Sequence, residues 1–389
     1  GDQNVAIGRC ALLTSLTGND NIAIGTEAMC SGYSGCNNIA IGCKALEDWT
    51  GQTGREGSVA IGTCALASIT TACGNTAVGH LAAQATTNGD NVAIGTWALY
   101  ANTGGEGTSS RHNVGIGFRA LDSSTSCGNI AIGYQAAYNQ SSGHSNVWIG
   151  CRAGYNQSTG DEIVAVGHKA GHSTRGDCTV AIGACSLYTN ATGSELVAIG
   201  HKALCSNFCA GFSTAVGFEA LMTAASATDN VAVGYKALCR ANASGNTALG
   251  ANALRFTEAG CYNMAIGYQT LYNNTNGTHN TAVGERALYS TNTGTHNTGL
   301  GSTALYANTT GLFNVGIGVN AGCNNTDGDC NTFMGYAAGR YNANGSTNTT
   351  SPDNSTYVGA CTRSYSVSSN NETVLGHCAC GCGDNTISF

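Results

Sequence analysis

A five-residue motif of one polar residue, three mostly apolar residues and a glycine recurs along the chain. It appears first as Asn4-Val5-Ala6-Ile7-Gly8 and returns as Asn21-Ile22-Ala23-Ile24-Gly25. Each copy is numbered from its Asn-equivalent residue, which is position 0. The 22 copies start at residues 4, 21, 38, 58, 75, 91, 113, 129, 146, 163, 179, 196, 213, 230, 246, 263, 280, 297, 314, 331, 355 and 372. Most spacings are 16 or 17 residues, which predicts a stacked repeat array.

Apolar residues occupy both sides of the predicted strand. Positions 1 and 3 carry Val, Ile, Leu, Met or Thr in every copy, and we expect this side to form the interior. Position 2, on the other side, is Ala in 15 copies and Gly in three. A uniform stripe of small residues indicates close packing, so we expect position 2 to face a neighbouring molecule or a covering segment. The alternative is that Ala is only tolerated on a crowded surface. The exceptions at position 2 are Trp148, Phe333, Tyr357 and Val374.

The remaining positions predict one complete rung of a solenoid. Gly stands at position 4 in all 22 copies, which indicates a positive φ or a close backbone approach. Asn at position 0, present in 15 copies, predicts a ladder of stacked amides. Ala and Leu at positions 7 and 8 predict a second short strand or a tight turn, before a polar loop.

We therefore predict an all-β fold, a parallel β-solenoid (β-roll) built from 22 repeats of about 17 residues. Residues 1–389 would form a single elongated domain. With rungs about 4.8 Å apart, it would be a rod on the order of 100 Å long.

Charge and hydropathy exclude some partners. Only 10% of the residues are charged and the net charge is -7, so no basic patch suits nucleic acid or an anionic membrane. No apolar run reaches the roughly 18 residues that a membrane-spanning helix needs.

Twenty cysteines avoid the predicted strand and concentrate at its flanking turns. Turns of adjacent rungs come close together, which favours disulfide bonds and an oxidising compartment, although the sequence leaves their connectivity open. The disulfide candidates are Cys10, Cys30, Cys36, Cys43, Cys64, Cys73, Cys127, Cys151, Cys178, Cys185, Cys205, Cys209, Cys239, Cys261, Cys323, Cys330, Cys361, Cys378, Cys380 and Cys382.

Twelve Asn-x-Ser/Thr sequons fall almost entirely in the polar half of the repeat. They indicate a glycan-coated face in an extracellular protein, unless they arise by chance in a chain rich in Asn, Ser and Thr. The glycosylation candidates are Asn139, Asn156, Asn190, Asn242, Asn273, Asn276, Asn308, Asn324, Asn344, Asn348, Asn354 and Asn371.

The Asn-Val-Ala-Ile-Gly motif resembles the repeats in the heads of YadA-type trimeric autotransporter adhesins. Longer units, such as the one starting at Asn280, look still more like the repeats of phage and virus tail-fibre proteins. The resemblance covers essentially the whole chain. It implies a left-handed β-roll and a homotrimer of rolls packed side by side on a cell or virion surface, with the Ala stripe as the expected place of packing. Bacterial and phage members are usually poor in cysteine, so 20 cysteines favour an extracellular eukaryotic or viral source.

Candidate chemistry is sparse. Asn325, Asp327 and Asp329 alternate as oxygen ligands do in calcium loops, but a distal bidentate Glu is absent. His168 and His172 have helical metal spacing inside a predicted turn, so we expect solvated histidines. Cys378, Cys380 and Cys382 favour disulfides or an inter-chain link over a soft-metal site. No catalytic residues and no cofactor are predicted.

The sequence favours a non-enzymatic structural protein of an extracellular fibre or filament, located on a cell or virion surface. Its predicted partners are copies of itself, as a homotrimer or an end-to-end filament assembled through small-residue faces and rung ends, and surface or matrix glycans.

The alternative is a ligand-binding solenoid that recognises glycans or ice. Ice binding usually needs an exposed Thr array, whereas Thr247, Thr281, Thr298 and Thr332 stand at position 1, which we assign to the interior.

Overall fold

The computed structural model describes residues 1–14, 17–31, 35–48, 57–69, 72–103, 111–209 and 211–389. The chain divides into two compact units, Gly1–Glu195 (unit 1) and Leu196–Phe389 (unit 2). Strands and turns make up both units, and no helix occurs within these ranges. The predicted all-β parallel solenoid is therefore confirmed.

Eleven three-residue strands stack in parallel in unit 1, and neighbours pair in register, as Val5 with Ile22 and Val164 with Val180. Each begins one residue after a predicted repeat start, which confirms the repeat register. Strands β11 (Ser173–Thr174) and β13 (Thr189–Asn190) form a second, short sheet. The eleven strands are β1 (Val5–Ile7), β2 (Ile22–Ile24), β3 (Ile39–Ile41), β4 (Val59–Ile61), β5 (Thr76–Val78), β6 (Val92–Ile94), β7 (Val114–Ile116), β8 (Ile130–Ile132), β9 (Val147–Ile149), β10 (Val164–Val166) and β12 (Val180–Ile182).

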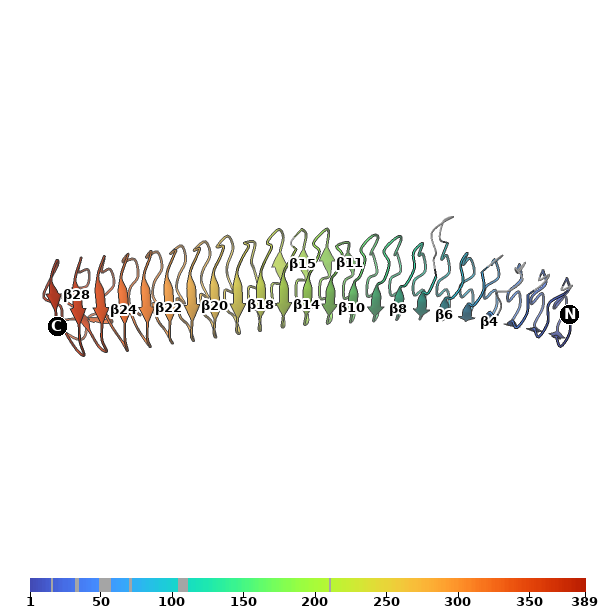
Figure 1. The fold of residues 1–389 in the computed structure, drawn as a ribbon, viewed down its shortest axis with the longest axis horizontal. Helices are drawn as coiled ribbons and strands as arrows, with labels where there is room; N and C mark the ends of the chain where they lie inside the picture. The colour runs from blue at the N-terminus through green and yellow to red at the C-terminus, as the bar shows by residue number, and fades with distance from the viewer. Residues whose placement is uncertain (15–16, 32–34, 49–56, 70–71, 104–110, 210) are drawn as a thin grey trace. The chain divides into compact units, whose positions relative to one another are not determined.

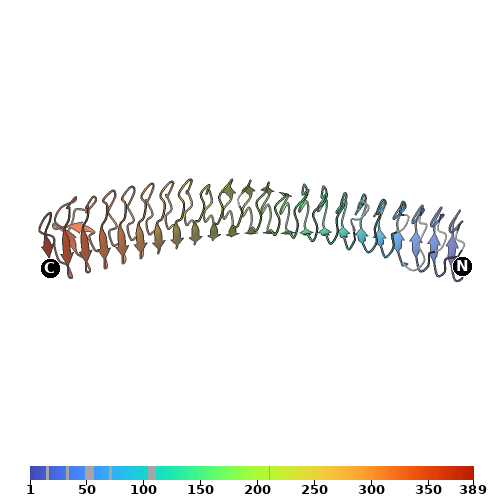
Figure 2. The same ribbon diagram turned by 45° about the horizontal axis from the view of Figure 1, so that its top comes forward.

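Unit 2 repeats this arrangement, and its strands lie along one side with the loops along the other (Figures 1 and 2). Its three-residue strands are β14 (Val197–Ile199), β16 (Thr214–Val216), β18 (Val231–Val233), β19 (Thr247–Leu249), β20 (Met264–Ile266), β21 (Thr281–Val283), β22 (Thr298–Leu300), β23 (Val315–Ile317), β24 (Thr332–Met334), β26 (Thr356–Val358) and β28 (Thr373–Leu375). Its two-residue strands are β15 (Ser206–Asn207), β17 (Thr223–Ala224), β25 (Tyr341–Asn342), β27 (Arg363–Ser364) and β29 (Ile387–Ser388). Strand β29 pairs with β28 and was missed because it lacks the motif.

The predicted inside and outside of the strands were wrong. Position 2 is buried in every three-residue strand except β1, as at Ala40 and Ala265, whereas positions 1 and 3 are half-buried or exposed in all of them. The reason is that the chain folds back on itself after each strand. A Cβ added at Gly115, a position 2 glycine, would lie 3.0 Å from the Ala120 carbonyl oxygen and 3.1 Å from Leu99 Cγ. The segment that covers the Ala stripe is thus the chain's own turn.

That turn is tight and buries Ala and Leu at positions 7 and 8, as at Ala45 and Leu46. The residues at positions 6 and 8 adopt left-handed backbone conformations, with φ of 57° at Lys44 and 54° at Leu46. For non-glycine residues this costs about 1–2 kcal/mol each. Hydrogen bonds to both neighbouring rungs offset the cost: Lys44 N donates to Thr26 O and Leu46 N to Ala65 O, both at 2.9 Å.

Glycine at position 4 meets both predicted requirements. The φ of these glycines lies between 117° and 141°, a range that side chains rarely adopt. A Cβ at Gly267 would also lie 2.7 Å from the Gly284 carbonyl oxygen.

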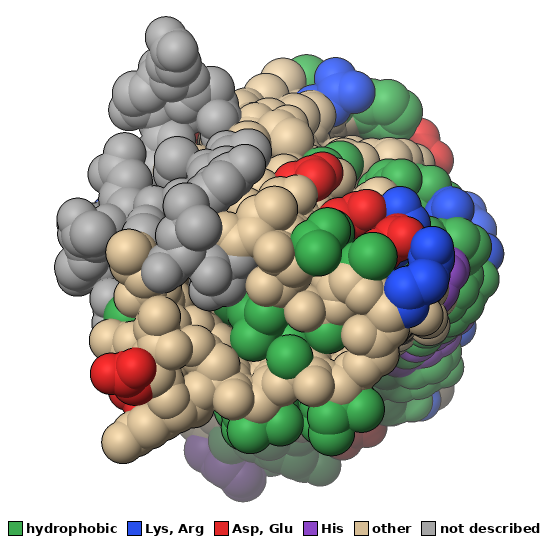
Figure 3. Space-filling model, turned by 90° about the vertical axis from the view of Figure 1, so that its right-hand side faces the viewer, with side chains coloured by type: hydrophobic (Ala, Val, Ile, Leu, Met, Phe, Trp, Pro, Cys, Tyr) green, Lys and Arg blue, Asp and Glu red, His purple; other side chains and the backbone are tan. Residues whose placement is uncertain are grey.

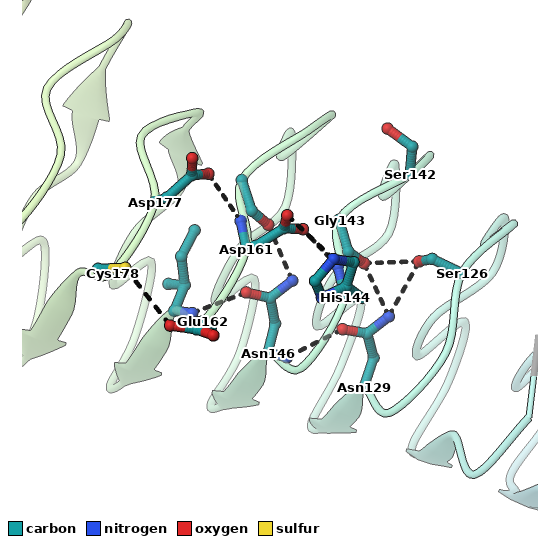
Figure 4. Close-up of polar contacts among 12 residues, drawn as sticks. Ser126, Asn129, Ser142, Gly143, His144, Asn146, Asp161, Glu162, Asp177 and Cys178 are labelled. Atoms are coloured by element: carbon teal, nitrogen blue, oxygen red, sulfur yellow. Dashed lines mark hydrogen bonds and ion pairs between the residues drawn. The ribbon is translucent and has the colours of Figure 1, made fainter.

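The Asn ladder at position 0 is confirmed. Asn280 Nδ2 donates to Asn263 Oδ1 at 3.1 Å and to Gly294 O at 2.8 Å, and Asn297 N donates to Asn280 Oδ1 at 2.9 Å. Figure 4 shows the corresponding bond in unit 1, where Asn146 N donates to Asn129 Oδ1 at 3.0 Å. The Asn280 amide therefore joins its own rung to the rungs before and after it.

Candidate functional site

The outward side chains at positions 1 and 3 form an apolar surface on each unit, which we name the sheet face. Ile94 and Ile149 in unit 1 are 39% and 38% exposed, and Leu249 and Met264 in unit 2 are 47% and 43% exposed. Because neighbouring strands pair in register, these side chains form two parallel columns in each unit. Contiguous exposed apolar surfaces of this kind mark sites of association.

The sheet face carries no charge. None of the three-residue strands contains Asp, Glu, Lys or Arg, although the whole chain has a net charge of -7. Hydrophobic side chains also reach the surface at the N-terminal end (Figure 3), where Val5 and Ile7 of β1 are exposed. The acidic groups therefore all lie outside the three-residue strands.

The threonines that we assigned to the interior, as a reason against ice binding, are not in the interior. Thr247, Thr281, Thr298 and Thr332 lie on the half-exposed sheet face rather than in the interior. Val231, Met264 and Val315 interrupt this column, however. Its longest run among the described strands is three threonines, Thr332, Thr356 and Thr373. In unit 2, seven of the eleven position 1 residues are Thr, whereas all eleven position 3 residues are apolar, so the threonines do not form a continuous array.

Aromatic rings stack along the turns, at right angles to the strands. In unit 1, Tyr138, Tyr155, His172 and Tyr188 lie one above another with ring centroids 5.2, 5.3 and 4.7 Å apart. In unit 2, Tyr272, Tyr289 and Tyr306 do the same at 5.2 and 5.1 Å. Inside such a stack the ring faces cover one another, so a sugar ring meets their edges rather than an open aromatic platform.

Cationic side chains lie against these rings. Arg119 Cζ is 4.6 Å from the centroid of the Trp97 ring, and Arg119 Nη1 donates to the Tyr138 hydroxyl at 3.0 Å. Arg152 Nε donates to Gln135 Oε1 at 3.1 Å. These guanidinium groups are thus used to hold adjacent rungs together.

Acid pH is expected to weaken unit 1 through His172, which is half-buried and stacked, not solvated as predicted from the sequence. Burial, and then Lys169, Arg152 and His168, lower its pKa. Folding therefore favours the neutral ring, so this stabilisation is present above the unfolded pKa of about 6.5 and is lost as the pH falls through the folded value.

We expect the urea midpoint of the wild-type chain to fall between pH 7.5 and pH 5.5, and to fall less in His172→Phe. The control is His112→Phe, because His112 is exposed in unit 1 and is not among the groups that lower the pKa of His172; it should keep the wild-type loss. Equal losses in wild type and His172→Phe would contradict the assignment.

The cysteines lie mainly on the turns, and the described residues contain no disulfide bond, so the predicted disulfides stay a prediction. Burial raises the pKa of Cys64 and the nearby Cys43 raises it further; the same holds for Cys30 with Cys10 as its neighbour. In each pair the two cysteines come from adjacent rungs, and they lie close enough for the charge of one thiolate to raise the pKa of the other thiol. Cys378, Cys380 and Cys382 are all exposed, and Cys378 Sγ lies 3.7 Å from His377 Nε2.

The sequons differ in accessibility. Asn190 and Asn308 are fully buried, and their side-chain amides donate to Gly193 O and Gly311 O within the same loop. Asn273 and Asn324 are half-buried. The exposed sequons are Asn139, Asn156, Asn242, Asn276, Asn344, Asn348, Asn354 and Asn371.

The three residues predicted as calcium ligands, Asn325, Asp327 and Asp329, form hydrogen bonds with different protein groups. Asn325 is buried and its Nδ2 donates to Asn308 Oδ1 at 3.2 Å. Asp327 accepts hydrogen bonds from the hydroxyls of Thr326 and Ser351, and the Ser351 bond lowers its pKa. Asp329 Oδ1 accepts from Leu312 N at 2.7 Å. No group of three or more His, Cys, Asp or Glu suited to a metal occurs in the described ranges.

Acidic side chains elsewhere serve the same backbone-capping role. Asp161 Oδ1 accepts from His144 N at 2.8 Å, and Asp177 Oδ1 accepts from Asp161 N at 2.9 Å (Figure 4).

Comparison with known proteins returned no match to a family model and none to a curated protein sequence. Among the described residues, no helix is long and apolar enough to cross a membrane.

Proposed function

We propose that the chain is a non-enzymatic structural protein of an extracellular fibre or filament, on a cell or virion surface, and that copies associate through the sheet face. The observation that carries this proposal is the charge-free face at positions 1 and 3, which continues over the eleven paired rungs of each unit and is apolar throughout at position 3 and apolar or Thr at position 1. The repeated hydrogen bonds between rungs supply stiffness. The polar loops and exposed sequons supply a solvated outer surface.

A second copy is the partner that fits this surface. Side chains on the sheet face repeat with the rung spacing, so only a partner with the same axial repeat can match them over many rungs. Apolar sheets pack face to face at about 10 Å, and the lack of charge lets two such faces meet without repulsion. This side-by-side mode is the one that the resemblance to trimeric adhesins and tail fibres implies.

Two lysines on the sheet face are expected to abolish this association. We compare the full-length wild type with Ile94→Lys/Ile149→Lys by sedimentation equilibrium and negative-stain microscopy. The wild type should have at least twice the chain mass, and the variant the mass of one chain, because burying unpaired ammonium groups costs several kcal/mol. The weakening should exceed about 100-fold.

The matched control is Ser142→Lys/Thr159→Lys, which adds the same charge on exposed loop residues. It should keep the wild-type mass. A single-chain mass for wild type at 50 µM (about 2 g/L for a 39.2 kDa chain) would overturn the proposal, and so would an unchanged mass for the sheet-face variant. End-to-end particles that keep their length in the sheet-face variant would favour the filament alternative.

A further inference from the structure

The longest interval between repeats, from 331 to 355, folds into a hairpin. Asn342 N donates to Thr347 O and Gly345 N to Asn342 O, both at 2.8 Å, and Tyr341 forms an antiparallel bridge with Asn348. The base of the hairpin, β25, pairs in parallel with β27, so that Tyr341 lies beside Arg363. The hairpin thereby forms one wall of a hollow of about 200 Å³.

Two arginines line this hollow. The Arg363 guanidinium lies against the hairpin tip: a Cβ at Gly345 would be 3.0 Å from its Nη1 and 3.2 Å from its Cζ. Arg340 Cζ lies 4.9 Å from the centroid of the Tyr341 ring. Tyr336 and Cys361 also line the hollow.

Neither guanidinium has an anionic partner within the described ranges. The ion pairs found there involve other residues, and no side-chain hydrogen bond is made by either arginine. Arg340 Nε is buried without a hydrogen-bond acceptor.

The nearest acidic residue in sequence to Arg363 is already occupied. Glu372 is fully buried and accepts hydrogen bonds from the Tyr357 and Ser364 hydroxyls, each at 3.1 Å, and from Tyr365 N. The two arginines therefore present a concentration of positive charge on a chain that is acidic overall.

We propose that this hollow binds an oxyanion, the sulfate or carboxylate group of an acidic sugar. Guanidinium groups bind such anions through paired N–H donors in one plane. The volume lies below the roughly 300–1,000 Å³ of pockets for drug-sized ligands, which suits one sugar-sized group. The tyrosines offer apolar walls for the body of the ligand. This site is separate from the sheet face, so its test does not depend on self-association.

The proposal is tested by calorimetric titration of the full chain with N-acetylglucosamine 6-sulfate, at constant ionic strength in chloride. Arg340→Gln and Arg363→Gln should each weaken binding about tenfold or more, as expected for loss of a charge-assisted pair. Arg255→Gln, which removes the same charge beside Phe256 and outside the hollow, should bind as the wild type does. N-acetylglucosamine without sulfate should not bind.

Inorganic sulfate distinguishes the source of the anion. If it binds as tightly as the sulfated sugar and is lost in the same variants, the oxyanion site stands and the sugar contributes nothing. No binding of either probe by the wild type would overturn the proposal, and so would equal losses in Arg255→Gln and Arg363→Gln.

Should either variant fail to fold, arginine modification of the wild type gives an independent result. Phenylglyoxal followed by peptide mapping should modify Arg340 and Arg363 more slowly when the sulfated sugar is present. Unchanged rates at both residues would also overturn the proposal.

Discussion

Replacing Asn280 by alanine is expected to lower the free energy of unfolding around its rung by about 3 kcal/mol, because four buried hydrogen bonds are lost and their partners are left unpaired. Its amide nitrogen bonds Asn263 and Gly294, and its amide oxygen accepts from both nitrogens of Asn297. Native-state amide hydrogen exchange should show faster opening of β20, β21 and β22.

Serine provides a graded variant, because the chain itself uses it at position 0. Ser213 Oγ accepts from Asn230 N at 3.2 Å, as the asparagine oxygen does in other rungs. Asn280→Ser should therefore recover part of the loss. The control is Asn276→Ala, at an exposed loop residue, which should leave exchange rates near those of the wild type. Equal exchange in Asn280→Ala and Asn276→Ala would show that the ladder contributes little.

Replacing Trp148 by alanine is expected to cost about 3–5 kcal/mol, since it empties the space of a fully buried indole. Trp148 occupies a position 2 that is Ala in most rungs, and Gly154 stands at position 8, where most rungs have Leu. A Cβ at Gly154 would lie 2.3 Å from Trp148 Cδ1. In this rung the large side chain thus stands at position 2 and the small residue at position 8, the reverse of most rungs.

Gly154→Leu alone should also destabilise, through this clash. The double variant Trp148→Ala/Gly154→Leu should regain at least half of the loss, because Leu tolerates the backbone here: φ is 61° at Gly154 and 51° at Leu99, the same position of another rung. Denaturant midpoints of the four proteins form a double-mutant cycle. Additive losses would mean that the two side chains do not share one space.

The repeat register, the glycine turn and the Asn ladder follow from the sequence because each needs one residue type at one position. Which face of each strand points into the interior does not follow from the sequence. Alternation separates the two sides of a strand, but here both sides are apolar, so hydrophobicity cannot show which is buried. The uniform Ala stripe was the better signal, since only a nearby wall demands one small size in so many rungs.

Other features have no local sequence signal. Lys44 and Leu46 are not residues that suggest left-handed backbone, and the hydrogen bonds that stabilise them come from the preceding and following rungs. The hollow between Arg340 and Arg363 likewise depends on β25 pairing with β27, residues from different repeats. Its signals in the sequence are the long interval and the hairpin tip at Asn344-Gly345.

In any cell that attaches glycans to Asn-x-Ser/Thr during secretion, folding of these loops competes with glycosylation of the Asn190 and Asn308 amides, which are buried in the folded chain. A sugar on either nitrogen would replace the bond to Gly193 O or Gly311 O and would have no room inside the rung. These loops must close before the glycosylating enzyme reaches them. The fraction of molecules that carry a glycan at Asn190 or Asn308 would then equal the fraction in which glycosylation preceded closure of the loop.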